Sequence, residues 1–458
     1  MSTLTDERTC WNPEIEEMPL DDIQAMQTFR LRRQLAQLVE RSPFYARKFV
    51  EARFDPAGLR SVADLARAPF TEKQELRDSQ IETPPLGDHA GVEMVDVIRV
   101  HSSSGTTGRP SYVGITRADR HRWTEVISRV YWCEGVRPHD VLVHGFGLGF
   151  FVGGLPLKDG IENIGATFVP IGTGASDRLV SGIEHLGATV LTCTPSYASY
   201  LAEYVRERFD ADPRDLGLQR ILLGAEPGGA VPAVRERIAD TYGAFVTEGL
   251  GNADVLPVYA GTCDELDGNH FLAPDQIVLE LVEPDSGEPV EWEDGAEGEL
   301  VATHIERDCV PLVRFRTRDR VVAAVSPCGC GRTGPRIRCV GRTDDMLIVA
   351  GVNVWPSSIS DVVMQLHPRT TGSLQVLLMA PPPKVEVPLR LQVEYGPEAT
   401  DLDALKRELE GRIRDTLIVK ADVELVPPGT LPRFEMKSQP LRHVYEETRN
   451  LRNQVAPK

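Results

Sequence analysis

The residues best suited to bind an anion lie in the segment 101–110, where hydroxyl side chains and glycines are concentrated. Glycines let the backbone approach an anion closely, and hydroxyl and N–H groups can surround phosphate oxygens. The segment is not a P-loop, because Arg109 and Pro110 follow Gly108 where that motif requires Lys and then Ser or Thr. A polar turn before a strand at 112–115 is the structural alternative, but the density of hydroxyls favours phosphate binding. The predicted phosphate-binding residues are Ser103, Ser104, Gly105, Thr106, Thr107 and Gly108.

Three cysteines and one histidine form a second group, which could hold a metal. Six residues separate Cys263 from His270, and Cys328 and Cys330 flank a glycine in a turn rich in Pro and Gly. Two such pairs can close a tetrahedral Cys₃His site, which is typical of structural zinc and leaves no open position for catalysis. Buried thiols beside a surface histidine are the alternative. We predict structural zinc bound by these four residues.

The chain has eight cysteines among 458 residues, too few for a disulfide scaffold. The polar, acidic segment 1–17 has neither a basic start nor an apolar core, so we predict no secretion signal, a cytoplasmic location and reduced thiols. Cys309 and Cys339 are nearby thiols that could replace a ligand in the predicted zinc site.

Charge and hydropathy exclude two classes of partner. The net charge of −18 argues against a nucleic-acid partner, because phosphate backbones attract basic surfaces. No apolar run approaches the roughly 18–20 residues that a membrane-spanning helix needs, so we predict no membrane insertion.

A second glycine-rich segment, 145–154, invites comparison with a dinucleotide-binding loop. The spacing does not fit, because Phe150 or Val152 stands where the third glycine should be. We interpret the segment as a wall of small residues beside a binding pocket.

The elements that must position these residues follow from the pattern of apolar positions. Periodicity predicts helices within 15–50, interrupted at Ser42 and Pro43. From about residue 92 short apolar runs alternate with helical segments, which is typical of an α/β domain whose strands feed ligand-binding loops. Strands are predicted at 141–143, 167–171, 189–192 and 220–223, with a β-rich part at 276–325 containing strands at 277–282, 298–303 and 321–325.

Several segments, taken in order, resemble the phenylacetate–CoA ligase family of acyl-adenylate-forming enzymes. The match extends over nearly the whole chain. The matching segments are 27–31, 42–45, 64–77, 101–110, 146–155, 224–227, 247–251, 311–319, 341–346, 351–356 and 431–437.

The resemblance implies an enzyme that uses ATP and Mg²⁺ to convert a small, aromatic carboxylic acid into an acyl-adenylate and transfers the acyl group to coenzyme A. It implies that Lys437, Glu248 and Arg342 are catalytic, that Glu248 holds magnesium, and that Asp319 binds ribose. Further ATP contacts are implied for Ala225, Glu226, Pro227 and Thr247. The implied acid pocket consists of Phe146, Gly147, Leu148, Phe151, Gly224 and Gly249.

The resemblance also implies two domains joined by a hinge. We expect an N-terminal adenylating domain over 1–341, built of several subdomains, and a small, mobile α+β domain over 342–458, with Asp344 at the hinge. Family members suggest a homodimer. A carrier-protein thiol or an amine is the alternative acceptor, and a catalytically silent scaffold on the same fold is the alternative class.

The sequence departs from the family pattern at three positions that bear on substrates. The aromatic residue expected to stack on adenine is displaced or is Phe245, and Met436 replaces the glycine before Lys437. Leu148 replaces an aromatic residue of the acid pocket, which suggests a substrate other than plain phenylacetate.

Overall fold

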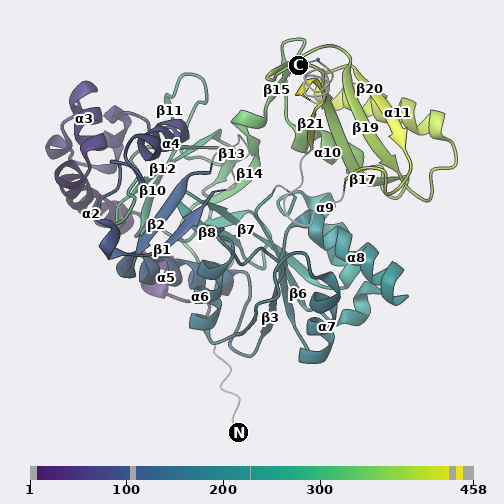
Figure 1. Cartoon of the computed structure of the whole chain (residues 1–458), viewed down its shortest axis with the longest axis horizontal. Coiled ribbons are helices and arrows are strands. Elements are labelled where there is room, and N and C mark those ends of the chain that lie inside the picture. Colours follow the sequence, from purple (N-terminus) through teal and green to yellow (C-terminus); the bar gives the residue numbers. More distant parts are fainter. Residues whose placement is uncertain (1–7, 104–109, 227, 433–439, 447–458) are drawn as a thin grey trace, which may run out of the picture.

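The computed structural model describes residues 8–103, 110–226, 228–432 and 440–446. These residues form a large domain and a smaller one beside it (Figure 1). Arg342 ends the last strand of the large domain, and a short 3₁₀ turn at Thr343–Asp345 leads into the small domain. The predicted fold class, an α/β domain with a β-rich part followed by a small α+β domain, is confirmed.

The N-terminal part is helical. Ser42 ends one helix and begins the next, because its hydroxyl accepts a hydrogen bond from the backbone N–H of Tyr45 and Pro43 occupies the first helical turn. The helices are α1 (Pro13–Glu16), α2 (Leu20–Arg41), α3 (Pro43–Glu51) and α4 (Lys73–Glu82).

A sheet that has twelve strands among the described residues forms the centre of the large domain. Its parallel part has the order β4-β3-β5-β6-β7, with α5 and α6 in the core of one face and α7, α8 and α9 in the core of the other. Ligands bind such sheets at the carboxyl ends of the strands. The elements are α5 (Arg117–Cys133), β3 (Val141–His144), α6 (Leu155–Ile164), β4 (Thr167–Val169), α7 (Ser176–Leu186), β5 (Val190–Cys193), α8 (Pro195–Phe209), β6 (Arg220–Leu223), α9 (Pro232–Tyr242) and β7 (Phe245–Asn252).

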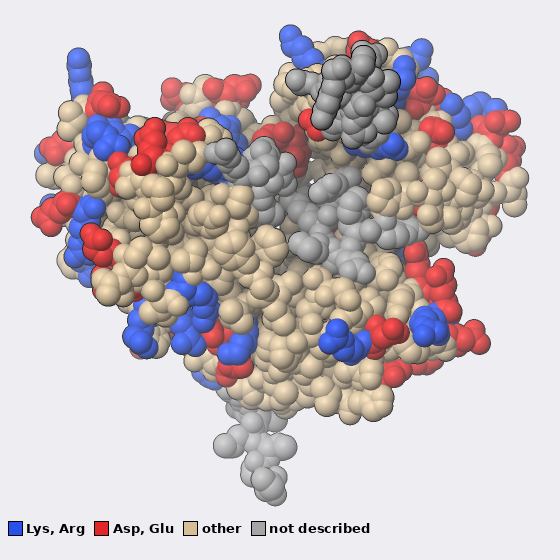
Figure 2. Space-filling model, in the orientation of Figure 1, with Lys and Arg blue, Asp and Glu red and all other residues tan. Residues whose placement is uncertain are grey.

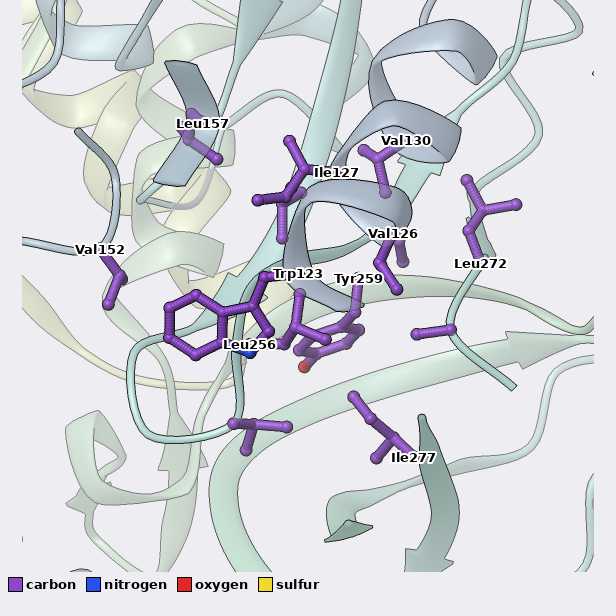
Figure 3. Packing of buried hydrophobic residues seen from close by; sticks show 14 of the residues in the cluster. Trp123, Val126, Ile127, Val130, Val152, Leu157, Leu256, Tyr259, Leu272 and Ile277 are labelled. Atoms are coloured by element: carbon purple, nitrogen blue, oxygen red, sulfur yellow. The ribbon is translucent and has the colours of Figure 1, made fainter. Parts of the chain in front are cut away.

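The strand β7 pairs in parallel with β6 and antiparallel with β8, so it joins the parallel part of the sheet to the β-rich part. Helix α5 packs over β8: Trp123, Val126 and Val130 on the helix lie close to Leu256 and Tyr259 on the strand (Figure 3). A separate hairpin of β1 (Val97–Ser102) and β2 (Tyr112–Thr116) flanks the predicted phosphate-binding segment. The β-rich strands are β8 (Leu256–Thr262), β9 (Asn269–Phe271), β10 (Ile277–Val282), β11 (Pro289–Val290), β12 (Glu297–His304), β13 (Phe315–Ala324) and β14 (Arg336–Arg342).

Among the described residues, the small domain has its own hydrophobic core, to which two long helices and two sheets contribute. The larger sheet has the order β20-β19-β17-β21 and the smaller one the order β16-β15-β18. The elements are β15 (Leu347–Val349), β16 (Val352–Val354), α10 (Pro356–Met364), β17 (Thr370–Leu378), β18 (Lys384–Val385), β19 (Leu389–Tyr395), α11 (Leu402–Leu417), β20 (Ala421–Val426) and β21 (Leu441–His443).

The surface carries charges of both signs. Figure 2 shows acidic and basic side chains interspersed over both domains on the face in view. Among the described residues, no helix is long and apolar enough to cross a bilayer.

Candidate active site

Glu248 lies on β7 next to the carboxyl end of β6, where it pairs with Leu223. Its side chain is buried, and Asn269 donates a hydrogen bond to Oε2 at 3.3 Å. Burial raises the pKa of Glu248 to about 7, although the bond from Asn269 and the backbone N–H groups of Ala230 and Gly229 oppose this. Among the described residues no Lys or Arg lies within 4.0 Å of this carboxylate, so a divalent cation could stabilise it, and carboxylate oxygen is the ligand type that Mg²⁺ prefers.

The predicted adenine turn follows β6 directly. Ala225 has a left-handed backbone (φ +70°), a conformation that is costly for a residue with a Cβ and is concentrated at functional sites. Glu226 is buried, and its Oε1 accepts a hydrogen bond of 2.7 Å from the backbone N–H of Ser196 at the start of α8. Thr247 is buried on the adjacent strand, and its hydroxyl has no hydrogen-bond partner among the described residues. Pro227 lies outside the described residues.

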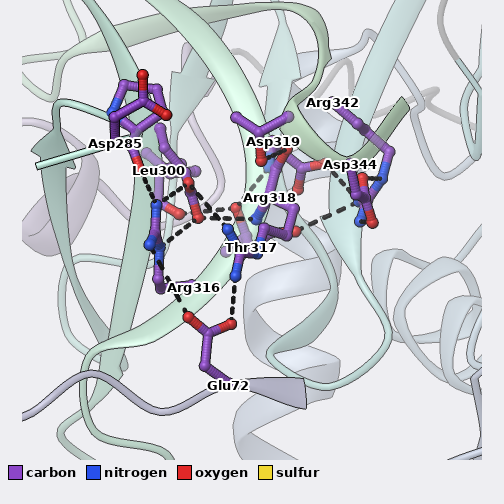
Figure 4. A network of polar contacts seen from close by, with 12 residues as sticks. Glu72, Asp285, Leu300, Arg316, Thr317, Arg318, Asp319, Arg342 and Asp344 are labelled. Atoms are coloured by element: carbon purple, nitrogen blue, oxygen red, sulfur yellow. Dashed lines mark hydrogen bonds and ion pairs between the residues drawn. The ribbon is translucent and has the colours of Figure 1, made fainter. Parts of the chain in front are cut away.

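Asp319 and Arg342 face each other across β13 and β14. Arg342 Nη1 donates to Asp319 Oδ1 at 2.8 Å, while its Nε and Nη2 donate to the two carboxylate oxygens of Asp344 at 2.9 Å each (Figure 4). The arginine therefore joins the predicted ribose carboxylate to the predicted hinge residue. The preceding residue, Arg318, has a left-handed backbone (φ +66°) and forms an ion pair with Glu72 at 2.6 Å.

The base of the predicted phosphate-binding segment is held by a chain of polar contacts. The hydroxyls of Ser103 and Ser111 lie 2.8 Å apart, and Ser111 donates to Asp254 Oδ1 at 2.7 Å. Lys73 forms an ion pair of 2.7 Å with the other oxygen of Asp254. The sequence reasoning missed Asp254, because a lone carboxylate after β7 has no motif that would reveal it. The predicted residues Ser104, Gly105, Thr106, Thr107 and Gly108 lie outside the described residues.

The predicted acid-binding residues come from the segment after β3 and from the ends of β6 and β7. A Cβ added to Gly147 would lie 3.9 Å from the ring of Phe151, and one added to Gly224 would lie 3.9 Å from the ring of Phe146. Ser102 at the end of β1 donates its backbone N–H to Phe150 O at 2.9 Å. This bond places the acid-binding segment beside the phosphate-binding one.

The remaining acid-binding positions complete this neighbourhood. Leu148 is partly buried, and its side chain lies 3.6 Å from the position that a Cβ on Gly172 would take. Gly249 is adjacent to Glu248 on β7, and its carbonyl oxygen lies 3.2 Å from the position of a Cβ on Gly224.

Phe245 is not placed to stack on a nucleotide. It begins β7, three residues before Glu248, and so lies toward the end of the parallel sheet opposite to the carboxyl edge. The guanidinium of Arg220 lies 4.9 Å from the centre of its ring. Of the two alternatives for the residue that stacks on adenine, an aromatic residue displaced from the family position therefore remains. Lys437 and Met436 lie outside the described residues.

The four predicted zinc ligands come together at the far end of the β-rich part. One ligand atom from each of Cys263, His270, Cys328 and Cys330 lies within 4.8 Å of the others. The sulfurs of Cys263 and Cys328 are 3.7 Å apart, and Cys330 Sγ is 3.3 Å from His270 Nε2. Zn–S bonds of about 2.3 Å at tetrahedral angles give an S···S separation of about 3.8 Å, so the donor set fits zinc.

The two spare thiols lie elsewhere. Cys309 is buried 2.6 Å from the position of a Cβ on Gly114, and Cys339 Sγ contacts Gly341 O at 3.6 Å. Neither belongs to the ligand cluster found among the described residues.

Comparison with known proteins relates this site to a family. The family model described as "AMP-binding enzyme" matches residues 42–305, and that described as "AMP-binding enzyme C-terminal domain" matches 351–443. The chain is 37% identical over 443 residues to a protein named phenylacetate-coenzyme A ligase from Thermus thermophilus, covering 93% of this chain and 97% of that protein.

Two solved structures of 2-hydroxyisobutyryl-CoA ligase extend the comparison. In the postadenylation state with R3-HIB-AMP, that ligase superposes with a TM-score of 0.90 at 31% identity, covering 98% of this chain and 95% of its own. In the thioesterification state with 2-HIB-AMP and CoA, the TM-score is 0.72 at 32% identity, covering 98% and 96%.

Identity and coverage are nearly the same for these two structures, but the TM-score is higher for the postadenylation state. The two domains of this chain are therefore arranged nearly as in the postadenylation state of that ligase. Similarity extends over both domains and nearly the full length of the relatives. The chain belongs to the phenylacetate–coenzyme A ligase family of AMP-binding enzymes.

Proposed function

We propose that the protein is an AMP-forming acid–coenzyme A ligase whose substrate is a small, aromatic carboxylic acid. The observation that carries the proposal is the convergence of Glu248 and the Asp319–Arg342 pair, whose charges all act on the same Cys339 thiol, while Gly249 beside Glu248 lies next to the acid-binding Gly224. The chain is also similar over 93% of its length to a named CoA ligase. A catalytically silent scaffold would have no need of this convergence.

The proposed reaction has two steps. A carboxylate oxygen of the acid attacks the α-phosphorus of ATP, and pyrophosphate leaves. The thiolate of coenzyme A then attacks the acyl carbon, and AMP leaves. The first step depends on positioning and on neutralising charge, because the protein takes no covalent part in it.

Each residue has a proposed part in the first step. Asp319 accepts hydrogen bonds from the ribose hydroxyls, one on each carboxylate oxygen, and Arg342 orients Asp319 through the 2.8 Å bond. Ser103 and the five residues that follow it bind the β- and γ-phosphates. Lys437 places its compact positive charge between the incoming carboxylate and the α-phosphate.

Glu248 is the proposed magnesium ligand. A bound Mg²⁺ would neutralise charge on the phosphates, as it does in phosphoryl transfer generally. Glu248 is buried, and its carboxylate forms no ion pair with a described Lys or Arg, which fits this assignment.

The small domain is proposed to rotate between the two steps. Lys437 would reach the site for adenylation and leave it for thiol transfer, with Asp344 at the hinge. The bidentate bond from Arg342 to Asp344 would hold the adenylation arrangement, and hinge closure of this kind concentrates the dihedral change in a few residues. The domain arrangement close to the postadenylation state of 2-hydroxyisobutyryl-CoA ligase supports this proposal.

A structural zinc ion is proposed at Cys263, His270, Cys328 and Cys330. The four ligand atoms lie within 4.8 Å of one another and could supply all four positions of a tetrahedral site, so the ion would stabilise the loops and take no part in the reaction. Reduced thiols agree with a cytoplasmic location, which we also propose. A homodimer is proposed from the family resemblance, and light scattering coupled to size-exclusion chromatography tests it.

One experiment separates the candidate functions. The protein is incubated with ATP, Mg²⁺ and a panel of aryl acids, with and without coenzyme A, and pyrophosphate and thioester are measured. Both products are expected for at least one acid. Pyrophosphate without thioester would indicate a carrier-protein thiol or an amine as acceptor, and no pyrophosphate with any acid would overturn the proposal.

A further inference from the structure

Gly224, which directly follows β6, and Gly249, within β7, share one face of the sheet. Leu223 pairs with Glu248 in parallel register, so Gly224 and Gly249 are neighbours and their side-chain positions point to the same side. It is the side covered by α5, because Leu222, two residues before Gly224, packs in the same core cluster as that helix. The ring of Phe146 also lies there, 3.9 Å from the position of a Cβ on Gly224.

A carboxyl group lies on the same face. Glu134 follows directly after α5, and its Oε1 lies 3.0 Å from the position that a Cβ on Gly249 would take. Gly261 pairs with Gly249 across β7 and β8, and a Cβ there would lie 3.4 Å from the same oxygen. The carboxyl group of Glu134 therefore packs closely against two paired glycines, where a larger side chain would crowd it.

The carboxyl group of Glu134 is buried, and one of its two oxygens is unsatisfied. The residue is 2% exposed, and Oε1 has no hydrogen-bond partner among the described residues. The nearby cation, Arg220, donates to the backbone oxygen of Glu134 at 3.3 Å and pairs its guanidinium with Asp264 at 2.9 Å. A buried carboxyl oxygen without a partner is costly, and such a group is retained where a ligand can satisfy it.

We propose that Glu134 selects the acid: its Oε1 accepts a hydrogen bond from a hydroxyl or amino group at the end of the substrate remote from the reacting carboxylate. This inference rests on the proposed function, since it assumes that the acid binds between Phe146 and the glycines of β6 and β7. The substrate class is then an aryl acid with a polar substituent, in keeping with the small residues and with Leu148 in place of an aromatic side chain.

The charge environment agrees with a hydroxyl or amino partner. Burial, and after it the neighbouring Glu248, hold the pKa of Glu134 well above its ordinary value. The protonated carboxyl group of Glu134 can accept a hydrogen bond from a substrate hydroxyl and donate one back to it. A substrate amino group that gains a proton would instead favour the ionised form of Glu134.

Matched acids and matched variants test the proposal. The acids are phenylacetate, 4-methylphenylacetate and the 3-hydroxy, 4-hydroxy and 4-amino derivatives, each assayed by acid-dependent pyrophosphate release. The variants are Glu134→Ala, Glu134→Gln and the control Glu162→Gln, which makes the same chemical change at an exposed residue of α6. Calorimetry of each acid binding to each variant provides a readout that is independent of turnover.

For the wild type, kcat/KM is expected to favour one of the hydroxy or amino acids over its methyl counterpart by about 2- to 10-fold, the range of a hydrogen bond between uncharged groups. Glu134→Ala should remove this preference while retaining turnover of phenylacetate, Glu134→Gln should retain part of it, and Glu162→Gln should leave it unchanged.

Two results would overturn the assignment of Glu134. One is an equal loss of kcat/KM for all acids in both Glu134→Ala and Glu134→Gln, and the other is a wild type that prefers the methyl acid. No pyrophosphate with any acid would instead overturn the proposed function, and the calorimetric preference for a polar substituent would then still decide whether Glu134 recognises it.

Discussion

Arg342 holds two carboxylates at once: Asp319 on the neighbouring strand, at 2.8 Å, and Asp344 two residues later, through two bonds of 2.9 Å. Asp319 belongs to the large domain and Asp344 to the turn that leads into the small one. A planar guanidinium can satisfy both because its donors point in fixed, divergent directions, which an ammonium group cannot reproduce. The nucleotide site and the hinge are thereby linked through one side chain.

This relationship predicts the effect of Arg342→Lys. Lysine can pair with only one of the two carboxylates, so Asp319 loses its orientation, and the KM for ATP should rise about 10-fold or more, the value of a hydrogen bond between charged groups. The matched control is Arg338→Lys on the same strand, whose side chain is exposed. Steady-state pyrophosphate release measures both variants, and equal KM values for the two would contradict the role of Arg342.

Much of the fold could be predicted, because several strands are apolar runs bounded by turn residues. The predicted strands 220–223 and 277–282 coincide with β6 and β10. The strand predicted at 321–325 begins earlier, at Phe315, because Arg316 and Arg318 alternate with buried residues and pair with Glu299 and Glu72. Charged residues of a strand that form ion pairs with distant residues cannot be recognised from a pattern of apolar positions.

The buried face of α2 shows a second limit of sequence reasoning. Phe29 belongs to the apolar pattern yet is 69% exposed, while Gln27 and Gln34 are buried. Their amides donate to the backbone oxygens of Pro274 and Arg307 at 3.0 and 2.9 Å. These partners lie more than two hundred residues away, so periodicity within the helix could not reveal them. Asp254 and Glu134 were missed for the same reason, since each acquires its meaning from distant chain segments.

Lys437→Ala should separate the two half-reactions. The variant is expected to lose acid-dependent ATP–pyrophosphate exchange, because no other charge would bridge the carboxylate and the α-phosphate, but to form thioester from a supplied acyl-adenylate at nearly the wild-type rate. Lys420→Ala, an exposed lysine of the same domain, should leave both reactions intact. Equal loss of both half-reactions in Lys437→Ala would rule out the proposed role.

Buried histidines predict a loss of stability in acid. Burial lowers the pKa values of His89, His101, His144 and His304 to about 4, from an ordinary value near 6.5. Between pH 6.5 and 4 the unfolded chain therefore binds protons that the folded chain does not, and the free energy of unfolding falls as the pH decreases. Above pH 6.5 these histidines are neutral in both the folded and the unfolded chain, so they no longer lower the free energy of unfolding.

His144→Phe tests this on one ring, which contacts the rings of Phe146 and Phe168. The free energy of unfolding, measured with urea, should fall between pH 7.5 and pH 5.5 in both proteins. The fall should be about 1 kcal/mol smaller in the variant than in the wild type, because one buried titrating group has been removed. The exposed His139→Gln should show the same loss as the wild type. An unchanged pH dependence in His144→Phe would contradict the prediction.

Zinc should be bound at about one ion per chain and should stabilise the fold without taking part in the reaction. Metal analysis of the purified protein is expected to find it, and Cys328→Ser should lose it, because a tetrahedral site that loses a thiolate loses most of its affinity. Cys339→Ser is the matched control, since that thiol lies outside the ligand cluster. Cys328→Ser should unfold at a lower temperature, whereas its activity per folded molecule well below that temperature should match the wild type. Absence of zinc from the wild type, or its loss from Cys339→Ser rather than Cys328→Ser, would refute the site. A fall in activity at temperatures where the variant is folded would show that the ion does more than hold the loops together.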